Sequence, residues 1–109
     1  MFDVRRLVVL REVARCGSLS AAASALTYTT SAVSQQITAL EREVGSTLLV
    51  RGPAGAQPTP AGRRLLEHAE DILAAIRAAE HDLARQATAA PDTLRVASHW
   101  AVRSSAEPS

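Results

Sequence analysis

The sequence predicts a mainly α-helical fold: a winged helix-turn-helix with a small two-stranded wing, followed by a long dimerisation helix. Three observations carry this prediction. Short segments with helical spacing of apolar residues are joined by tight turns in the first half of the chain. A short apolar run then precedes a turn rich in glycine and proline. After this turn, a heptad pattern of apolar residues continues for about 26 residues.

The first two helices are predicted from apolar spacing and from residues that favour helix ends. Segment 4–16 has helical spacing, and Gly17 favours the left-handed conformation that often ends a helix. Ser18 is a typical N-cap for a short alanine-rich helix over 20–26. Alanine lets another helix approach closely, so the two segments predict a helix-turn-helix. The spacing in the first segment comes from Leu7, Leu10, Val13 and Ala14.

The third predicted helix, over 30–44, has an apolar side and an uncharged polar side. The apolar residues fall together at about 100° per residue, so they should be buried against the first two helices. Short uncharged side chains on the other side suit hydrogen bonding to base edges and phosphates in a major groove. The alternative is a surface helix with local hydroxyl–backbone bonds, and this segment alone leaves both interpretations open. The apolar residues are Val33, Ile37, Leu40 and Val44, and the opposite side carries Ser31, Gln35, Thr38 and Arg42.

A two-stranded wing is predicted directly after the third helix. Segment 48–51 has the character of a short strand, 52–55 that of a turn, and 56–58 that of the return strand. Pro58 suits only an edge position, so the wing should be small. Arg51, at the end of the first strand, is placed to reach a phosphate or a minor groove. Its alternative role is a surface ion pair, which contributes little to stability.

The long helix is predicted to follow Thr59, a favourable N-cap, with Pro60 as its first residue. About 26 residues at 1.5 Å each give a rod of about 39 Å, which so small a domain cannot cover. A second copy of the same helix would bury the remaining apolar surface. The alternative is a helix that folds back on its own domain. The predicted seam consists of Leu65, Ala69, Ile72, Ile76, Ala79 and Leu83.

Together these segments resemble the N-terminal region of the LysR-type transcriptional regulators. The resemblance covers residues 1–85, and its most specific part is the run Ala-Val-Ser-Gln-Gln-Ile over 32–37. It implies a winged helix-turn-helix that binds double-stranded DNA. It also implies a linker helix that pairs two subunits into a homodimer. A full-length form could assemble into a tetramer. The blocks that carry it, in order, are 18–26, 30–41, Gly45 with 48–51, and 59–62.

By position, the resemblance implies that Thr30, Ser31, Ser34 and Gln35 approach bases and phosphates, and that Arg51 is the wing arginine. The chain departs from the family pattern at two of these positions, because Thr30 stands where the family usually has Gln and Ser31 where it often has Pro. Two further positions that are commonly Phe are leucines here. The complete predicted DNA-binding set is Thr29, Thr30, Ser31, Ser34, Gln35, Thr38 and Arg51.

Three segments are expected along the chain. They are a DNA-binding domain over 1–59, the linker helix over 60–87, and a poorly ordered hinge with the start of an effector domain over 88–109. Residues 93–97 resemble the first strand of the two-lobed effector-binding domain of the family. Since the sequence does not contain the remainder of that domain, we expect a shortened regulator or a piece of a longer one. No small-molecule effector site is expected in this chain.

Composition and spacing argue against other functional classes. The formal net charge of +1 favours none of them. Cys16 is the single cysteine, so neither an internal disulfide nor a cysteine metal site is predicted. His68 and His81 are too far apart on the long helix to share a metal ion. No nucleophile elbow and no glycine-rich phosphate loop occurs. We therefore predict no enzyme activity, no metal site and no cofactor.

Targeting signals are also missing from the sequence. No apolar run approaches the ~20 residues that span a bilayer, and the N-terminus lacks the apolar core of a signal peptide. A cytoplasmic protein without membrane contact is expected. Two alternatives to this DNA-binding regulator stay open: a helical protein-interaction module that does not bind DNA, and a winged-helix domain of another regulator family. An interaction module has no need for uncharged residues along the exposed side of the third helix.

Overall fold

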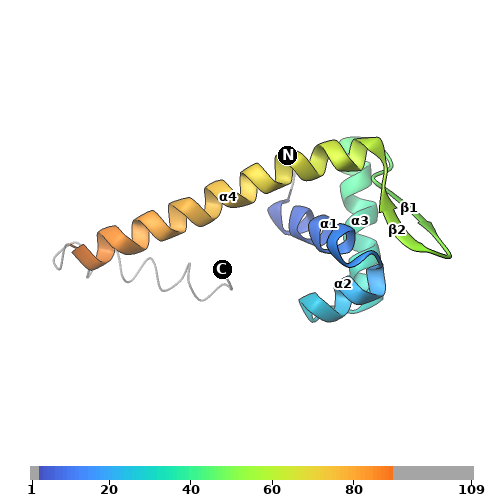
Figure 1. Ribbon diagram of the computed structural model, residues 1–109, viewed down its shortest axis with the longest axis horizontal. Helices are drawn as coiled ribbons and strands as arrows, with labels where there is room; N and C mark the ends of the chain where they lie inside the picture. Colours follow the sequence, from blue (N-terminus) through green and yellow to red (C-terminus); the bar gives the residue numbers. More distant parts are fainter. Residues whose placement is uncertain (1–2, 90–109) are drawn as a thin grey trace. The chain divides into compact units, whose positions relative to one another are not determined.

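A computed structural model describes residues 3–89 of the chain (Figure 1). The predicted winged helix-turn-helix with a two-stranded wing and a long C-terminal helix is confirmed. The residues that resemble the start of an effector domain fall within 90–109, outside the described residues. The elements in order are α1 (Val4–Cys16), α2 (Leu19–Leu26), α3 (Thr30–Val44), β1 (Leu49–Gly52), β2 (Gly55–Pro58) and α4 (Pro60–Ala89).

The chain forms two compact units, Met1–Glu70 and Asp71–Ser109. The first unit contains the helix-turn-helix, the wing and the first turns of α4, and the rest of α4 belongs to the second unit. The boundary expected from the sequence, between 59 and 60, marks the point where α4 begins. The compact unit extends about three helical turns beyond that point.

Helices begin and end where the sequence offers capping groups. Gly17 and Gly45 end α1 and α3 in the left-handed conformation, with φ of 81° and 73°. α2 ends at Thr27 with φ of 61°, which is uncommon for a β-branched residue and places backbone strain in the turn before α3. The N-caps are Asp3, Ser18 and Thr29, whose side chains accept hydrogen bonds from main-chain N–H groups in the first turns of α1, α2 and α3.

The core of the first unit is built from aliphatic side chains. The apolar side of α3 is inward as predicted, except that Val44, near the helix end, is only half-buried. The buried alanines of α2 are small, so they allow α1 and α3 to approach this short helix closely. Buried side chains come from α1 (Leu7, Val9, Leu10, Val13), α2 (Ala22, Ala23), α3 (Val33, Ile37, Leu40), the wing region (Leu48, Leu49, Ala56) and α4 (Leu65, Ala69).

Glu12 of α1 is a carboxylate buried at the edge of this core, with 8% of its surface exposed. It accepts hydrogen bonds from the Arg15 guanidinium and, at 3.6 Å, from the Cys16 thiol. The hydrogen bond from Arg15, aided by its positive charge, holds the pKa of Glu12 below its usual value of 4.5, although burial acts in the opposite direction. The buried charge is therefore compensated within α1 itself.

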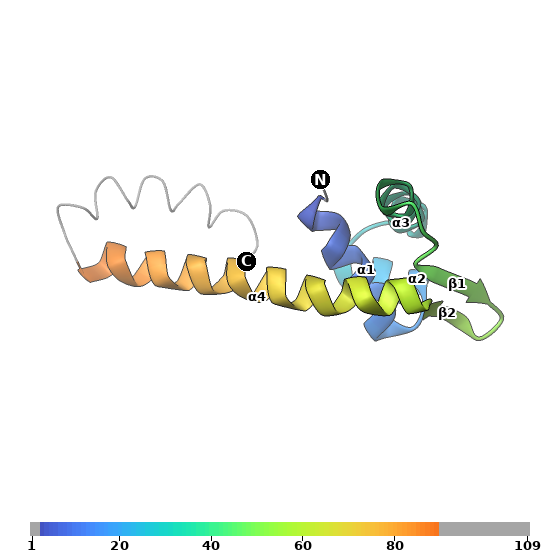
Figure 2. The same cartoon turned by 90° about the horizontal axis from the view of Figure 1, so that it is seen from above.

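β1 and β2 pair as an antiparallel hairpin, and the two strands lie side by side in both views (Figures 1 and 2). The register pairs Leu49 with Pro58 and Arg51 with Ala56. The first strand begins one residue later than predicted, because Leu48 is held by contacts to α3 and to the start of α4. Each strand has four residues, in agreement with the small wing that Pro58 indicates.

Main-chain hydrogen bonds connect the wing to the helical part of the unit. At its outer end, the Ala56 N–H donates to the Gly17 carbonyl at 2.9 Å, and this links β2 to the turn between α1 and α2. Gly55 permits this close approach for two reasons. A Cβ at this position would lie 2.2 Å from the Gly17 carbonyl oxygen, and the Gly55 backbone has a φ of 109°, which other residues rarely adopt. The wing is therefore attached by backbone as well as by side chains.

The start of α4 is attached in the same way. The Thr59 N–H donates to the Leu48 carbonyl at 2.9 Å, and the Thr59 hydroxyl donates to the Thr47 carbonyl at 2.6 Å and accepts from the Gly62 N–H at 3.0 Å. A Cβ at Gly62 would lie 2.2 Å from the Leu48 carbonyl oxygen. The first turn of α4 thus depends on a glycine that packs against the main chain before β1.

Candidate nucleic-acid interface

The outward side of α3 carries the side chains that the sequence predicts for DNA contact. Ser31 and Gln35 are exposed, and Thr38 is half-buried further along the helix. Val33, Ile37 and Leu40 on the opposite side of α3 are buried, so these polar side chains face away from the core. The charged residues come only near the C-terminal end of the helix. The structure therefore leaves an uncharged, hydrogen-bonding surface along the first half of α3.

The N-terminal end of α3 extends this polar surface. Thr29 and Thr30 are exposed, and the Thr29 hydroxyl accepts a hydrogen bond from the Ala32 N–H at 3.0 Å. Main-chain N–H groups of the first helical turn point out of the helix end, where the helix dipole favours a negative charge. A phosphate group is therefore compatible with this end of the helix.

The wing arginine and α3 meet in the folded protein. Arg51 of β1 is exposed, and its Nη1 donates a hydrogen bond to the Ser34 hydroxyl at 3.2 Å. This contact joins two residues that the sequence analysis selected from separate segments, 17 positions apart. A guanidinium group is thus held beside the uncharged side of α3, where it can bind a phosphate of the same nucleic-acid segment.

Glu41 positions the wing relative to α3, a role that the sequence analysis did not find. One carboxylate oxygen, Oε2, accepts from the main-chain N–H groups of Leu48 at 2.8 Å and Leu49 at 3.3 Å. The interaction connects the C-terminal part of α3 with Leu48 and with Leu49, the first residue of β1. In the sequence, Glu41 has the appearance of one of several charges in the last helical turns, so no local signal distinguishes it.

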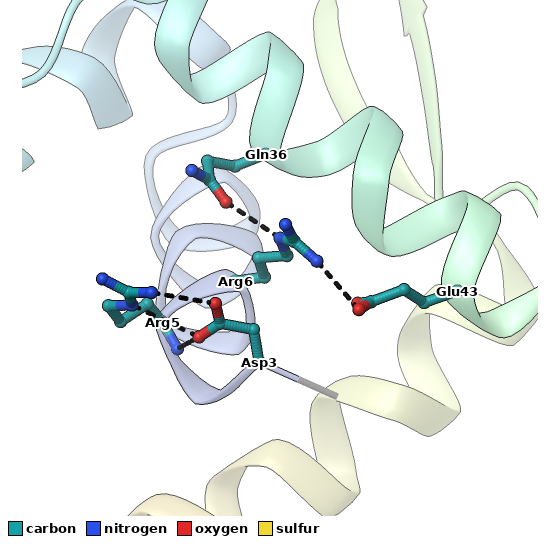
Figure 3. A network of polar contacts seen from close by, with 5 residues as sticks. All are labelled: Asp3, Arg5, Arg6, Gln36 and Glu43. Carbon is teal, nitrogen blue, oxygen red and sulfur yellow. Dashed lines mark hydrogen bonds and ion pairs between the residues drawn. The ribbon is translucent and has the colours of Figure 1, made fainter. Parts of the chain in front are cut away.

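Arg6 of α1 is a second positioning residue that the sequence analysis missed. Its Nε donates to Gln36 Oε1 at 3.0 Å, and its Nη1 lies 2.8 Å from Glu43 Oε2 (Figure 3). The neighbouring Arg5 instead pairs with Asp3, the N-cap of α1, and the Nη2–Oδ2 distance is 3.1 Å. Arg6 therefore joins α1 to α3 on a side of α3 that the apolar core does not occupy.

The predicted dimerisation seam of α4 divides into two parts. Leu65 and Ala69 are buried within the first unit, so their side chains are not available to a partner. Ile76 and Leu83 belong to the second unit and are 37% and 49% exposed. Of the predicted seam, Ile72, Ile76, Ala79 and Leu83 belong to the second unit. Their contact with a partner stays a prediction.

Within 3–89, no group of three or more His, Cys, Asp or Glu side chains is arranged to hold a metal ion. None of the helices in this part of the chain combines the length and the hydropathy needed to cross a bilayer.

Comparison with known proteins identifies similar sequences over most of the described chain. Residues 4–63, more than half of the chain, match the family described as "Bacterial regulatory helix-turn-helix protein, lysR family". The chain is 45% identical over 71 residues to the probable HTH-type transcriptional regulator LrrA of Synechococcus elongatus, covering 65% of this chain and 24% of the relative. It is 40% identical over 102 residues to the HTH-type transcriptional regulator ArgP of Pseudomonas aeruginosa, covering 89% and 32%. The chain thus spans about a quarter to a third of the length of these curated relatives.

The structure also resembles solved structures. The crystal structure of the CbnR_DBD–DNA complex matches with a TM-score of 0.71 and 33% sequence identity, and the match covers 80% of this chain and 99% of that chain. At this identity and score the two chains share their fold over nearly the whole of the matched protein. That neighbour is described as a complex with DNA.

Proposed function

Because the chain belongs to the LysR family of bacterial regulatory helix-turn-helix proteins, we propose that it regulates transcription by binding double-stranded DNA with α3 in the major groove. The observation that carries this proposal is the uncharged hydrogen-bonding surface along the first half of α3, with Arg51 held beside it by Ser34. Such a surface can bond to base edges without the desolvation cost of burying a charge.

The proposed contacts fall into two groups. Arg51, Ser34 and the N-terminal end of α3, with Thr29 and Thr30, bind phosphates and set the orientation of the domain. Gln35, with Ser31 and Thr38, contacts base edges and discriminates between sequences. The first group contributes affinity for any duplex, whereas the second group contributes the difference between a cognate and a random duplex.

Dimerisation is proposed to occur through the second unit. The large side chains of Ile76 and Leu83 are exposed on α4 and separated by seven residues, so they lie on one side of the helix. A second copy of α4 would remove this apolar surface from water. The segment 60–87 is then a linker helix that presents two DNA-binding domains, over 1–59, to one duplex. In a full-length form, two such dimers can associate into a tetramer.

A regulator of this kind acts where the chromosome is, so we place the protein in the cytoplasm. The curated relatives are named as transcriptional regulators. We accordingly assign a regulatory role and no catalytic one, and no cofactor is invoked.

The proposal is tested by fluorescence anisotropy of the chain on a labelled duplex across a salt series, beside Arg51→Ala. We expect the logarithm of the association constant to fall linearly with the logarithm of the salt concentration, with a slope of about 0.9 per neutralised phosphate. In the variant this slope should be smaller by the contribution of about one phosphate contact. Absence of duplex binding at low salt by a folded, dimeric chain would contradict the proposal. It would favour a protein-interaction module instead.

A further inference from the structure

Arg6 holds two residues of α3 that lie two helical turns apart. It donates to the Gln36 side chain at 3.0 Å and pairs with the Glu43 carboxylate at 2.8 Å (Figure 3). The side chains of Arg6 and Glu43 are only 26% and 30% exposed, so water screens this ion pair less than a fully exposed one. Positions seven residues apart on a helix differ by about 20° in direction and about 10 Å along the axis. A single guanidinium therefore contacts α3 at two levels on one side.

The buried side chains that pack α1 against α3 are aliphatic. Burial of apolar area has no preferred direction in itself, so it specifies the orientation of α3 mainly through side-chain shape. A hydrogen bond instead requires a narrow range of distance and angle, and the planar guanidinium presents its donors in a fixed geometry. The two Arg6 contacts thus restrict both the rotation of α3 and its position along its axis.

The restriction acts next to the proposed base-contacting residue. Gln36 directly follows Gln35, and successive side chains on a helix are about 100° apart. When Arg6 fixes the direction of Gln36, it also fixes the direction in which Gln35 leaves the helix. A bidentate contact to a base edge tolerates only a few tenths of an ångström, so this direction matters for recognition.

We propose that Arg6 is a positioning residue for sequence recognition: by holding Gln36 and Glu43 it sets the rotation and axial register of α3, and so the base sequence that the protein prefers. This inference rests on the proposed DNA-binding function. Arg6 is not itself a DNA ligand in this proposal, because its guanidinium is engaged between α1 and α3.

The test separates positioning from charge and from stability. The wild-type chain is first used to select duplexes from a random library. The ratio of its affinities for the selected duplex and for a scrambled duplex is then measured by anisotropy. Arg6→Met should lower this ratio about fivefold or more, since one discriminating contact is lost or misaligned. Arg5→Met removes the same charge from the adjacent position and should leave the ratio unchanged.

A charge-swapped double variant provides the rescue. In Arg6→Glu with Glu43→Arg the net charge is that of the wild type, and the ion pair between α1 and α3 is restored with reversed polarity. The Gln36 amide can turn over and donate to the new carboxylate, because it carries both a donor and an acceptor. We expect this variant to recover most of the lost ratio, which a loss of stability or of positive charge would not explain.

Three results would overturn the inference. The first is an unchanged ratio in folded Arg6→Met. If that variant does not fold, Arg6→Lys takes its place, because lysine keeps the positive charge but lacks the rigid, planar set of donors. A wild-type affinity ratio in Arg6→Lys is the second result. The third is a wild-type chain that enriches no sequence from the library. This third result removes the proposed function as well, whereas the first two leave it standing.

Discussion

In the proposed DNA complex, Gln35 distinguishes one base pair from another, because its side-chain amide offers a donor and an acceptor at fixed spacing. The exposed position of Gln35 on α3 leaves both groups available to a ligand. We predict that Gln35→Ala costs about 1–3 kcal/mol of binding free energy on a selected duplex and little on a scrambled one. Anisotropy titrations of both duplexes provide the measurement.

Gln86 is a suitable control for this prediction. It is an exposed glutamine near the C-terminal end of α4, and Gln86→Ala should leave both affinities at the wild-type value. Equal losses on the selected and the scrambled duplex in Gln35→Ala would show that Gln35 contributes affinity but no base discrimination.

Glu12 should make the stability of the first unit depend on pH. Its pKa is lowered in the folded state by the hydrogen bond and charge of Arg15, so the folded state favours the carboxylate form. The stabilisation is therefore complete above the usual pKa of 4.5 and is lost as the pH falls through the lower folded-state pKa. We predict that the difference in Tm between wild type and Glu12→Gln is largest near neutral pH and shrinks below about pH 4.5.

Thermal melts followed by circular dichroism at a series of pH values measure this difference. Asp3, whose pKa is lowered by side-chain and main-chain hydrogen bonds from Arg5, leaves a residual acid dependence in both proteins. A Tm difference that stays constant from neutral to acid pH would show that the Glu12 carboxylate is no better stabilised in the folded than in the unfolded chain.

At the scale of elements, the junction between the wing and α4 depends on Gly62. In most helices a Gly→Ala change stabilises by about 1 kcal/mol, because alanine has the higher helix propensity. Here the new Cβ would lie 2.2 Å from the Leu48 carbonyl oxygen, and a main-chain atom cannot move aside cheaply. We predict the opposite sign: Gly62→Ala should destabilise the protein by about 1–3 kcal/mol.

Chemical denaturation of Gly62→Ala beside Gly52→Ala measures this effect. A Cβ at Gly52 meets nothing within 4 Å, so that substitution should change stability much less. If Gly62→Ala is as stable as the wild type or more so, the start of α4 does not pack against the main chain at Leu48 in solution.

The bounds of the elements followed largely from local signals in the sequence. The end of α1 agrees with the prediction because Gly17 stops the helix, and α3 has the predicted bounds, with Thr29 and Gly45 as its caps. α2 begins at Leu19, one residue earlier than predicted, since Ser18 caps it directly. α4 continues to Ala89, beyond the predicted end at 87, since no glycine or proline stops it there. Signals of capping and of periodicity act over a few residues, and this is why they can be found without a structure.

The candidate site was only partly predictable, because its geometry depends on contacts between distant residues. The exposure of Ser31 and Gln35 followed from the helical wheel. The bond of Arg51 to Ser34 and that of Arg6 to Gln36 could not be found, because the partners are 17 and 30 positions apart and each residue resembles an ordinary surface polar group in the sequence. The burial of Leu65 within the first unit could not be predicted from the sequence either, because core residues and dimer-interface residues follow the same heptad pattern.

At the scale of the whole molecule, the proposed homodimer depends on the C-terminal half of α4. Leu83 is 49% exposed, so burial in a partner interface is the simplest source of stabilisation for this side chain. We predict that Leu83→Asp converts the dimer to a monomer, because a carboxylate cannot be buried without a partner of opposite charge. Sedimentation velocity over a concentration series provides the measurement.

Ala78→Asp is the matched control for dimerisation. Ala78 is exposed on α4, and it lies on the side of the helix away from Leu83 according to the angle of about 100° per residue. The control should sediment as the wild type does. If Leu83→Asp also keeps the wild-type mass, the α4 seam is not the interface, and dimers must form elsewhere or not at all.

The backbone attachment of the wing has a consequence for how the protein can be altered. The bonds from Ala56 to the Gly17 carbonyl and from Thr59 to the Leu48 carbonyl use main-chain atoms only. Replacing the exposed side chains at Pro53, Ala54 and Gln57 therefore leaves these attachments in place. These exposed positions are therefore suited to attached labels or randomised residues, since side chains can be exchanged there while the main-chain attachments of the wing stay in place.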